Sequence, residues 1–180
     1  MKFKLFVIIL CLQTACILGM TLIQERNLLL GTVVLLETVP RDPRDLLRGD
    51  YIVLNYKIGR IPEILIKSAN TQFEEEGTPV WVELEKHGEF HEAVGVYATR
   101  SAVPAGNVVL KGETEYRWLI DPGLSVNYGI DHYYVREGTG DPQGKITVQV
   151  VVPPSGQGII KEVFVDGRPY AQAMKGQPHP

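Results

Sequence analysis

The chain opens with an unbroken apolar segment and then changes to short runs in which apolar and polar residues alternate. Residues Leu5 to Ile23 read LFVIILCLQTACILGMTLI and contain no charge. As a helix that rises ~1.5 Å per residue, this segment would extend roughly 29 Å, about the thickness of a bilayer core. The pattern predicts one N-terminal transmembrane helix, and we assign residues 1–27 to a membrane anchor.

The charges that flank the apolar segment predict its orientation. Lys2 and Lys4 precede it, whereas Glu25 and Arg26 follow it and nearly cancel each other. The positive-inside rule then places the N-terminus in the cytoplasm and the rest of the chain outside.

Two alternatives to an uncleaved anchor stay open. A cleaved signal peptide would need a short apolar region and a small-x-small cleavage site, and no site in this segment is convincing. A lipoprotein signal is matched in part by Thr14-Ala15-Cys16, but Gln13 stands where a leucine is usual. The chain's two cysteines, Cys11 and Cys16, both lie within the apolar segment, so the remainder has no thiol for a disulfide or a thiolate metal site.

From residue 28 onward, alternation and β-branched residues predict a series of short strands with turn signals between them. We expect strands at residues 32–38, 51–56, 108–110, 116–120, 128–135, 146–152 and 158–165. Alternating helices are not predicted, so the pattern favours a mainly β fold, a single antiparallel barrel or sandwich-like domain over residues 28–170. Residues 171–180, which end in QPHP, are expected to form a flexible tail.

Two segments of this domain carry more detailed predictions. Pro79–Glu85 and Phe90–Thr99 predict a hairpin around His87-Gly88, with Val80, Val82 and Leu84 facing the core and Trp81, Glu83 and Glu85 facing solvent. Residues 61–70 (IPEILIKSAN) predict a short helix, because Pro62 suits a first helical turn.

Composition excludes several classes of function. The net charge is -3 and the basic residues are scattered among acidic ones, so the chain lacks the clustered basic face of a nucleic-acid-binding protein. Neither GxxxxGK[ST] nor GxGxxG occurs, and no cofactor is predicted. His87, Glu89 and His91 surround the predicted hairpin turn, where the two histidines would splay apart, so we predict no metal site.

The densest motif is Arg48-Gly49-Asp50-Tyr51-Ile52-Val53-Leu54-Asn55-Tyr56, which follows a turn-forming stretch of prolines, arginines and aspartates. A Gly-Asp that opens a strand also occurs near the nucleophile of signal-peptidase-like serine proteases. No serine lies between Met1 and Lys67, so the nucleophile of such an enzyme is missing from its place.

This motif resembles the signature of the bacterial GDYXXLXY family, and two further blocks extend the likeness. Pro43 to Tyr51 is similar to the family's P-R-D-x-x-R-G-D-Y opening, and Tyr128 to Gly138 to its second block, with Asp131, Tyr134 and Arg136 as departures. Gly158 to Gly167 fits its closing strand and turn. The resemblance implies a membrane-anchored, exported bacterial domain of unknown activity, with a multi-pass membrane protein as partner. In a Gram-negative source, the orientation predicted by the positive-inside rule places this domain on the periplasmic side of the inner membrane.

The candidate site residues lie in the first two blocks. As binding residues we select Arg44, Asp45, Arg48, Asp50, Tyr51, Tyr56, Tyr128 and Glu137; as structural residues of the motif we select Gly49, Leu54 and Gly129. We expect the four charged residues of the first block to form a paired cluster close to the second block, because two such blocks are most simply explained if they meet across neighbouring strands. Tyr51 and Tyr56 are expected on opposite faces of the signature strand.

The predicted function is a non-enzymatic accessory or interaction module at the membrane surface. The alternative is a hydrolase of cell-envelope material that uses acidic residues, for which Asp50, Asp121, Asp131, Glu137 and Asp141 are the candidates. A concave pocket with convergent, buried carboxylates would favour the enzyme.

Overall fold

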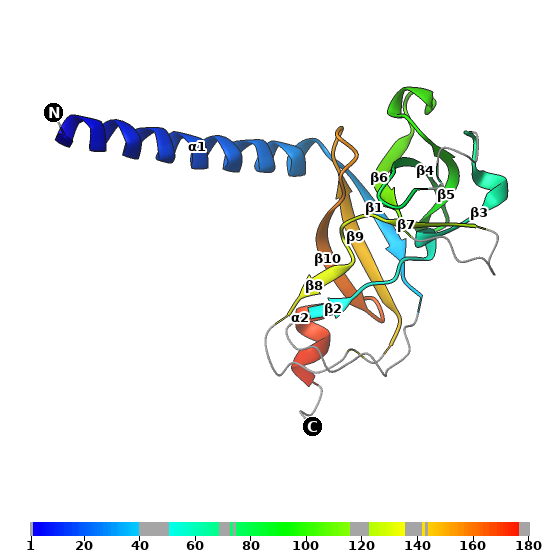
Figure 1. Ribbon diagram of the computed structural model, residues 1–180. Helices are drawn as coiled ribbons and strands as arrows, with labels where there is room; N and C mark the ends of the chain where they lie inside the picture. Colours follow the sequence, from blue (N-terminus) through cyan, green and yellow to red (C-terminus); the bar gives the residue numbers. More distant parts are fainter. Residues whose placement is uncertain are drawn as a thin grey trace.

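A computed structural model describes residues 2–39, 51–68, 73, 75–115, 123–135, 142 and 144–176. Its first element is a single helix, α1 (Lys2–Leu30), which extends beyond the apolar segment Leu5 to Ile23 at both ends. The stretch Phe3–Leu30 is long and apolar enough to cross a membrane, and none of it is buried against the rest of the chain. Figure 1 shows α1 projecting away from a domain made mainly of strands.

In the described residues, eleven strands follow the helix. They are β1 (Thr32–Glu37), β2 (Tyr51–Val53), β3 (Arg60–Pro62), β4 (Pro79–His87), β5 (Phe90–Tyr97), β6 (Val108–Thr114), β7 (Gly123–Asn127), β8 (His132–Tyr134), β9 (Ile146–Val152), β10 (Ile159–Val165) and β11 (Arg168–Pro169). Short helical turns complete the described chain: η2 (Lys57–Gly59), η3 (Glu63–Leu65), η5 (Arg100–Ala102), α2 (Tyr170–Ala173) and η6 (Met174–Gly176).

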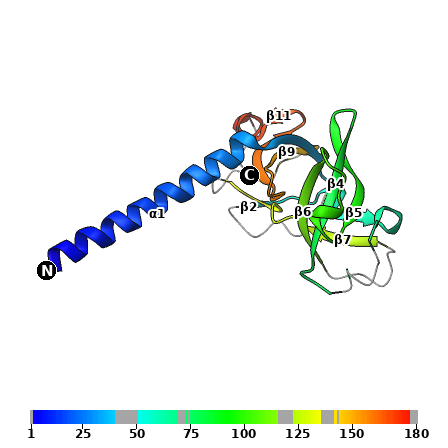
Figure 2. The ribbon, with the colours of Figure 1, turned by 90° about the horizontal axis from the view of Figure 1, so that it is seen from above.

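The strands form three antiparallel sheets that together make a nearly closed barrel. One sheet has the order β1-β9-β10-β11, the second β3-β7-β6-β4-β5, and the third is the pair β2-β8. The two larger sheets curve around a common interior (Figure 2). Single bridges between Thr38 and Tyr56 and between Ile66 and Val96 link the sheets to the segments between them. The fold predicted from the alternation pattern is therefore confirmed.

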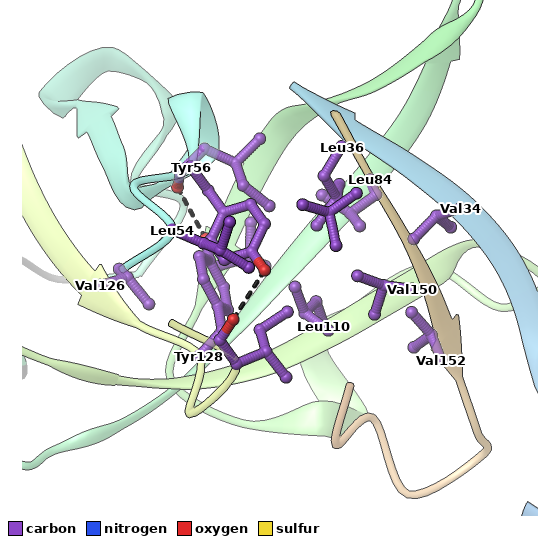
Figure 3. Close-up of a cluster of buried hydrophobic side chains, with 14 of the residues drawn as sticks. Val34, Leu36, Leu54, Tyr56, Leu84, Leu110, Val126, Tyr128, Val150 and Val152 are labelled. Carbon is purple, nitrogen blue, oxygen red and sulfur yellow. Dashed lines mark hydrogen bonds between the residues drawn. The ribbon is translucent and has the colours of Figure 1, made fainter. Parts of the chain in front are cut away.

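The core is built from the inward positions of these strands. Val148 and Val150 of β9 and Val80 and Val82 of β4 have no solvent-exposed surface. Figure 3 shows side chains from β1, β4, β6, β7 and β9 converging with Leu54, Tyr56 and Tyr128. Each fully buried aliphatic side chain of this kind stabilises the fold by roughly 1.5–3 kcal/mol. The branched residues that predicted strands are thus also the residues that form the interior.

The hairpin and the closing strands agree with the sequence-based predictions, but residues 61–68, the described part of the segment predicted as a short helix, do not form one. Ile61 lies in β3, where it pairs with Leu124 of β7 and is 1% exposed. Pro62 ends that strand, and η3 is a single turn. The local preference of this segment for helix is outweighed because pairing with β7 buries Ile61 in the core. Strand β7 itself was not predicted, and the strand expected at 116–120 lies outside the described residues.

Glu83 was expected to face solvent, but it is buried. The pairing of β4 with β5 shifts register between Glu83 and Leu84, and three successive residues of β4, Val82, Glu83 and Leu84, are buried there. Tyr97 donates a hydrogen bond to the Glu83 carboxylate at 2.9 Å, and Asn107 donates a second one. The residue opposite Glu83 is Gly95, whose lack of a side chain leaves room for this group.

Part of the expected flexible tail is folded. Tyr170 begins α2, directly after β11, and Met174 is 6% exposed within the hydrophobic core cluster. The chain therefore continues to pack against the domain beyond residue 171, because these two apolar side chains cover the end of the sheet that holds β10 and β11.

Candidate functional site

The signature and the second block form one two-stranded structure. β2 pairs with β8 in antiparallel register, with Tyr51 opposite Tyr134, Ile52 opposite Tyr133 and Val53 opposite His132. We call these six residues the signature ribbon. The expectation that the two blocks meet across neighbouring strands is confirmed.

Hydrogen bonds continue this union beyond the ribbon. The backbone N–H of Leu54 donates to the carbonyl of Asp131 at 2.7 Å. Leu54 is 2% exposed, which makes it part of the core as well as of the motif. The family motif thus contributes a buried side chain at the point where its backbone joins the second block.

Two tyrosines, Tyr56 and Tyr128, tie the blocks together in a reciprocal way. The Tyr56 hydroxyl donates to the carbonyl of Ile130, and the Tyr128 hydroxyl donates to the carbonyl of Ile58, each at 2.7 Å. Each hydroxyl therefore reaches the backbone two residues beyond the other tyrosine, as the dashed lines in Figure 3 show. We call Tyr56 and Tyr128 the tyrosine pair.

The tyrosine pair is held in its neutral form. Burial raises the pKa of Tyr128, and burial together with the nearby Asp131 carboxylate raises the pKa of Tyr56. Both hydroxyls therefore remain protonated donors at neutral pH, and neither suits proton transfer to a substrate. Their geometry assigns them to holding the two blocks together.

The outer face of the signature ribbon carries three rings in contact. Tyr51 lies 4.8 Å from His132 and 6.1 Å from Tyr134 between ring centroids. Tyr134 is 77% exposed. The imidazole Nδ1 of His132 lies 2.9 Å from a carboxylate oxygen of Asp131. This aromatic face, defined as Tyr51, His132 and Tyr134, presents both flat apolar surface and polar atoms to the outside.

The inner face of the ribbon packs on the domain. Tyr133 meets Tyr170 of α2 edge-on, with the ring centroids 5.7 Å apart, and Ile52 packs against the core cluster. Alternation thus separates the ribbon into a packed face and an aromatic outer face. The strand predicted at residues 51–56 ends at Val53, so Tyr56 lies beyond it rather than on its opposite face; Tyr56 is buried, whereas Tyr51 is half-buried on the outer face.

Gly129 makes the turn between the tyrosine pair and β8. Its φ is +68°, and its N–H donates to the Asn127 side chain at 2.7 Å. A glycine adopts this left-handed conformation without the steric strain that a Cβ would add. The turn carries the chain from buried Tyr128 to the outer ribbon.

Several candidate residues lie outside the described part of the chain. These are Arg44, Asp45, Arg48, Gly49, Asp50 and Glu137, and among the proposed acid-base residues also Asp121 and Asp141. The expected charge cluster of the first block therefore stays a prediction. Asp131 is the described member of the acidic set, and its carboxylate faces His132 rather than a second acid.

In the described residues, no group of three or more His, Cys, Asp or Glu side chains is arranged to hold a metal ion. His91 instead joins two strands. Its Nδ1 accepts the backbone N–H of Leu35 at 3.3 Å, which links β5 to β1 at the seam of the barrel. Burial lowers the pKa of His91, and the neutral ring is the form that can accept this bond.

Sequence reasoning did not select His132 and Tyr134, which complete the aromatic face. The signal that could have found them is alternation: if Tyr133 faces inward, its two neighbours face outward together with Tyr51. A cluster of ion pairs was also missed. Glu37 contacts Lys145 at 2.6 Å and Lys57 at 3.5 Å, and these partners come from distant parts of the sequence. The hydrogen bond from Lys145 lowers the pKa of Glu37.

Comparison with known proteins gives a family but no characterised relative. The family model described as GDYXXLXY protein matches residues 13–163. Comparison with curated proteins and with solved structures finds no match. The matched stretch contains the signature, the tyrosine pair and both strands of the ribbon, and it spans well over half of the chain; the chain therefore belongs to the GDYXXLXY family.

Proposed function

We propose that this protein is a membrane-anchored interaction module that works with a multi-pass membrane protein, with its β domain on the periplasmic side of the inner membrane. The observation that carries the proposal is the direct passage from α1 into β1. An apolar helix with no residue buried in the domain ends at Leu30, and the first core strand begins at Thr32. A helix that is apolar all round is stable in a bilayer.

The site supports binding rather than chemistry. The hydroxyls of the tyrosine pair donate to backbone carbonyls, and Tyr134 of the aromatic face is 77% exposed. Tyrosine is enriched both at protein interfaces and at the membrane–water interface, because it combines a large apolar ring with a hydroxyl. The hydrolase alternative gains no support from the described residues, since Asp131 there has a histidine and not a carboxylate as its neighbour.

Photocrosslinking in native membranes tests the proposal. A photoreactive residue is placed at Leu18, 58% exposed within α1, and separately at Ile64, 83% exposed in η3 on the domain. We expect the Leu18 probe to form an adduct with a multi-pass membrane protein and the Ile64 probe to form none. The proposal is contradicted if the probe at Leu18, and probes placed at neighbouring positions of the helix, form adducts with lipid only.

Orientation is tested with the same exposed position. Ile64→Cys is introduced together with Cys11→Ala and Cys16→Ala, which leaves a single thiol. A membrane-impermeant maleimide should label this thiol in intact spheroplasts as fully as in lysed ones. Labelling only after lysis would place the domain in the cytoplasm.

A further inference from the structure

The junction between α1 and the domain leaves no room for a flexible linker. Gly31 alone separates Leu30 from β1, and Thr32 already pairs with Val152 of β9. A Cβ on Gly31 would lie 2.3 Å from a methyl of Val151 and 3.0 Å from the carbonyl of Asn27, so the chain is closely packed as it leaves the helix. The orientation of the domain relative to the helix is therefore set by packing rather than by a tether.

This junction turns a defined side of the domain toward α1. Figures 1 and 2, which differ by a quarter turn, both place β2 and β8 on the side of the domain from which α1 projects. In both views β5 and β7 lie on the far side. The signature ribbon thus lies on the side of the domain that faces α1, and β5 and β7 lie on the side that faces away from it.

The apolar surface of the helix also reaches the domain. Leu28, Leu29 and Leu30, the last residues of α1, are 42%, 81% and 58% exposed. Glu25 and Arg26 precede them by one turn, which places charged groups and exposed leucines together over the final two turns of the helix. This mixture is typical of the layer where lipid headgroups meet acyl chains.

We propose that the aromatic face, Tyr51, His132 and Tyr134, lies in the headgroup layer of the bilayer that α1 crosses. The inference rests on the anchoring role of α1 given under the proposed function. Tyrosine rings favour this layer because the ring contacts the upper acyl chains while the hydroxyl stays hydrated. The imidazole of His132, held beside Asp131, adds a polar group that can hydrogen-bond to phosphate or glycerol oxygens.

The inner face of the ribbon explains why this contact would be firm. Tyr133 packs on Tyr170, and the backbone behind the ribbon is joined by the tyrosine pair. The aromatic face is therefore presented by a rigid support, so little side-chain or backbone freedom is lost when it enters the lipid. The contact would give the anchored domain a second point of attachment and fix its rotation about the helix axis.

The test measures where a nitroxide label sits. The full chain with Cys11→Ala and Cys16→Ala is reconstituted in vesicles of phosphatidylethanolamine and phosphatidylglycerol, with the label on Tyr134→Cys. The control label is on Ile64→Cys, which starts from a similarly exposed residue. We expect the Tyr134 label to be relaxed several-fold more by oxygen, which partitions into lipid, than by a water-soluble nickel chelate, and the Ile64 label to show the reverse.

Equal nickel access at both positions would overturn the proposal. A second label on His132→Cys must give the same ranking as Tyr134, and a circular dichroism spectrum like that of the parent confirms folding of each variant. If the Tyr134 label is in water in pure lipid but becomes shielded in native membranes, the occupant is a protein, which overturns lipid contact and leaves the proposed function intact. If the label is in lipid but no partner crosslinks to α1, the proposed function fails and the lipid contact stands.

Discussion

The tyrosine pair yields the sharpest energetic prediction. Tyr128→Phe removes a fully buried hydroxyl and leaves the carbonyl of Ile58 without that donor. A buried polar group that loses its partner costs about 1–3 kcal/mol, so the free energy of unfolding should fall by this amount. Tyr56→Phe should act in the same way through Ile130. For a chain of this size, each kcal/mol corresponds to a Tm change of roughly 2–4 °C.

The two losses should not add. Both hydrogen bonds hold the same two segments together, so the first substitution loosens the attachment that the second would have broken. We expect the double variant to be less destabilised than the sum of the single variants by at least about 0.5 kcal/mol, which is within the usual range for neighbouring residues. Urea titrations of the full chain in detergent micelles, followed by circular dichroism, measure all four corners of the cycle.

Tyr134→Phe is the matched control. It removes the same hydroxyl from an exposed residue, so the free energy of unfolding should change by less than about 0.5 kcal/mol. The reasoning is refuted if Tyr128→Phe unfolds at the parent's midpoint. Strict additivity of the two buried substitutions would show that the bonds act independently, and the reciprocal arrangement would then have no energetic meaning.

Three further predictions concern other parts of the domain. The folded-state pKa of His91 lies below its usual value of 6.5, so the unfolded chain binds the proton first as the pH falls. The stability that depends on the bond from Leu35 is therefore present above about pH 6.5 and should decrease as the pH drops below that value. Urea midpoints compared at neutral and mildly acidic pH should show this loss in the parent and not in His91→Gln. Glu83→Ala should cost about 1–3 kcal/mol because Tyr97 loses its acceptor, and Glu83→Gln should recover part of this midpoint shift. Gly129→Ala should cost about 1–2 kcal/mol in thermal melting through its φ of +68° alone, since nothing lies within 4 Å of the added Cβ; an unchanged Tm would argue against backbone strain.

The sequence predicted elements well where local pattern and core burial agree. β9 was expected at residues 146–152 and has these bounds, because Val148, Val150 and Val152 alternate and all three are buried. The sequence-based prediction failed where a partner distant in sequence decides the outcome. Ile61 is in a strand because it pairs with β7, and Glu83 is buried because of the register shift and the hydrogen bond from Tyr97. The residues next to Ile61 and Glu83 in the sequence do not indicate these interactions.

The candidate site was predictable in part for the same reason. The likeness of two sequence blocks to one family indicated that they meet, and the pairing of Tyr51 with Tyr134 bears this out. The reciprocal hydrogen bonds of the tyrosine pair could not be foreseen, because they depend on how far each hydroxyl reaches across the fold. The aromatic face likewise depends on which side of β8 packs against α2, and the three-residue strand is too short to show that by its own pattern.

The pairing of β1 with β9 has a consequence for how the chain acquires its structure. Thr32 lies opposite Val152, so the strand made first finds its neighbour only when most of the chain exists. At about 5–20 residues per second of synthesis, β1 waits roughly 6–24 seconds with an unpaired edge. Pairings so distant in sequence also close slowly. A nascent chain of this kind is exposed to misfolding and aggregation during that interval, and its yield in cells should depend on whatever shields the edge of β1 until β9 arrives.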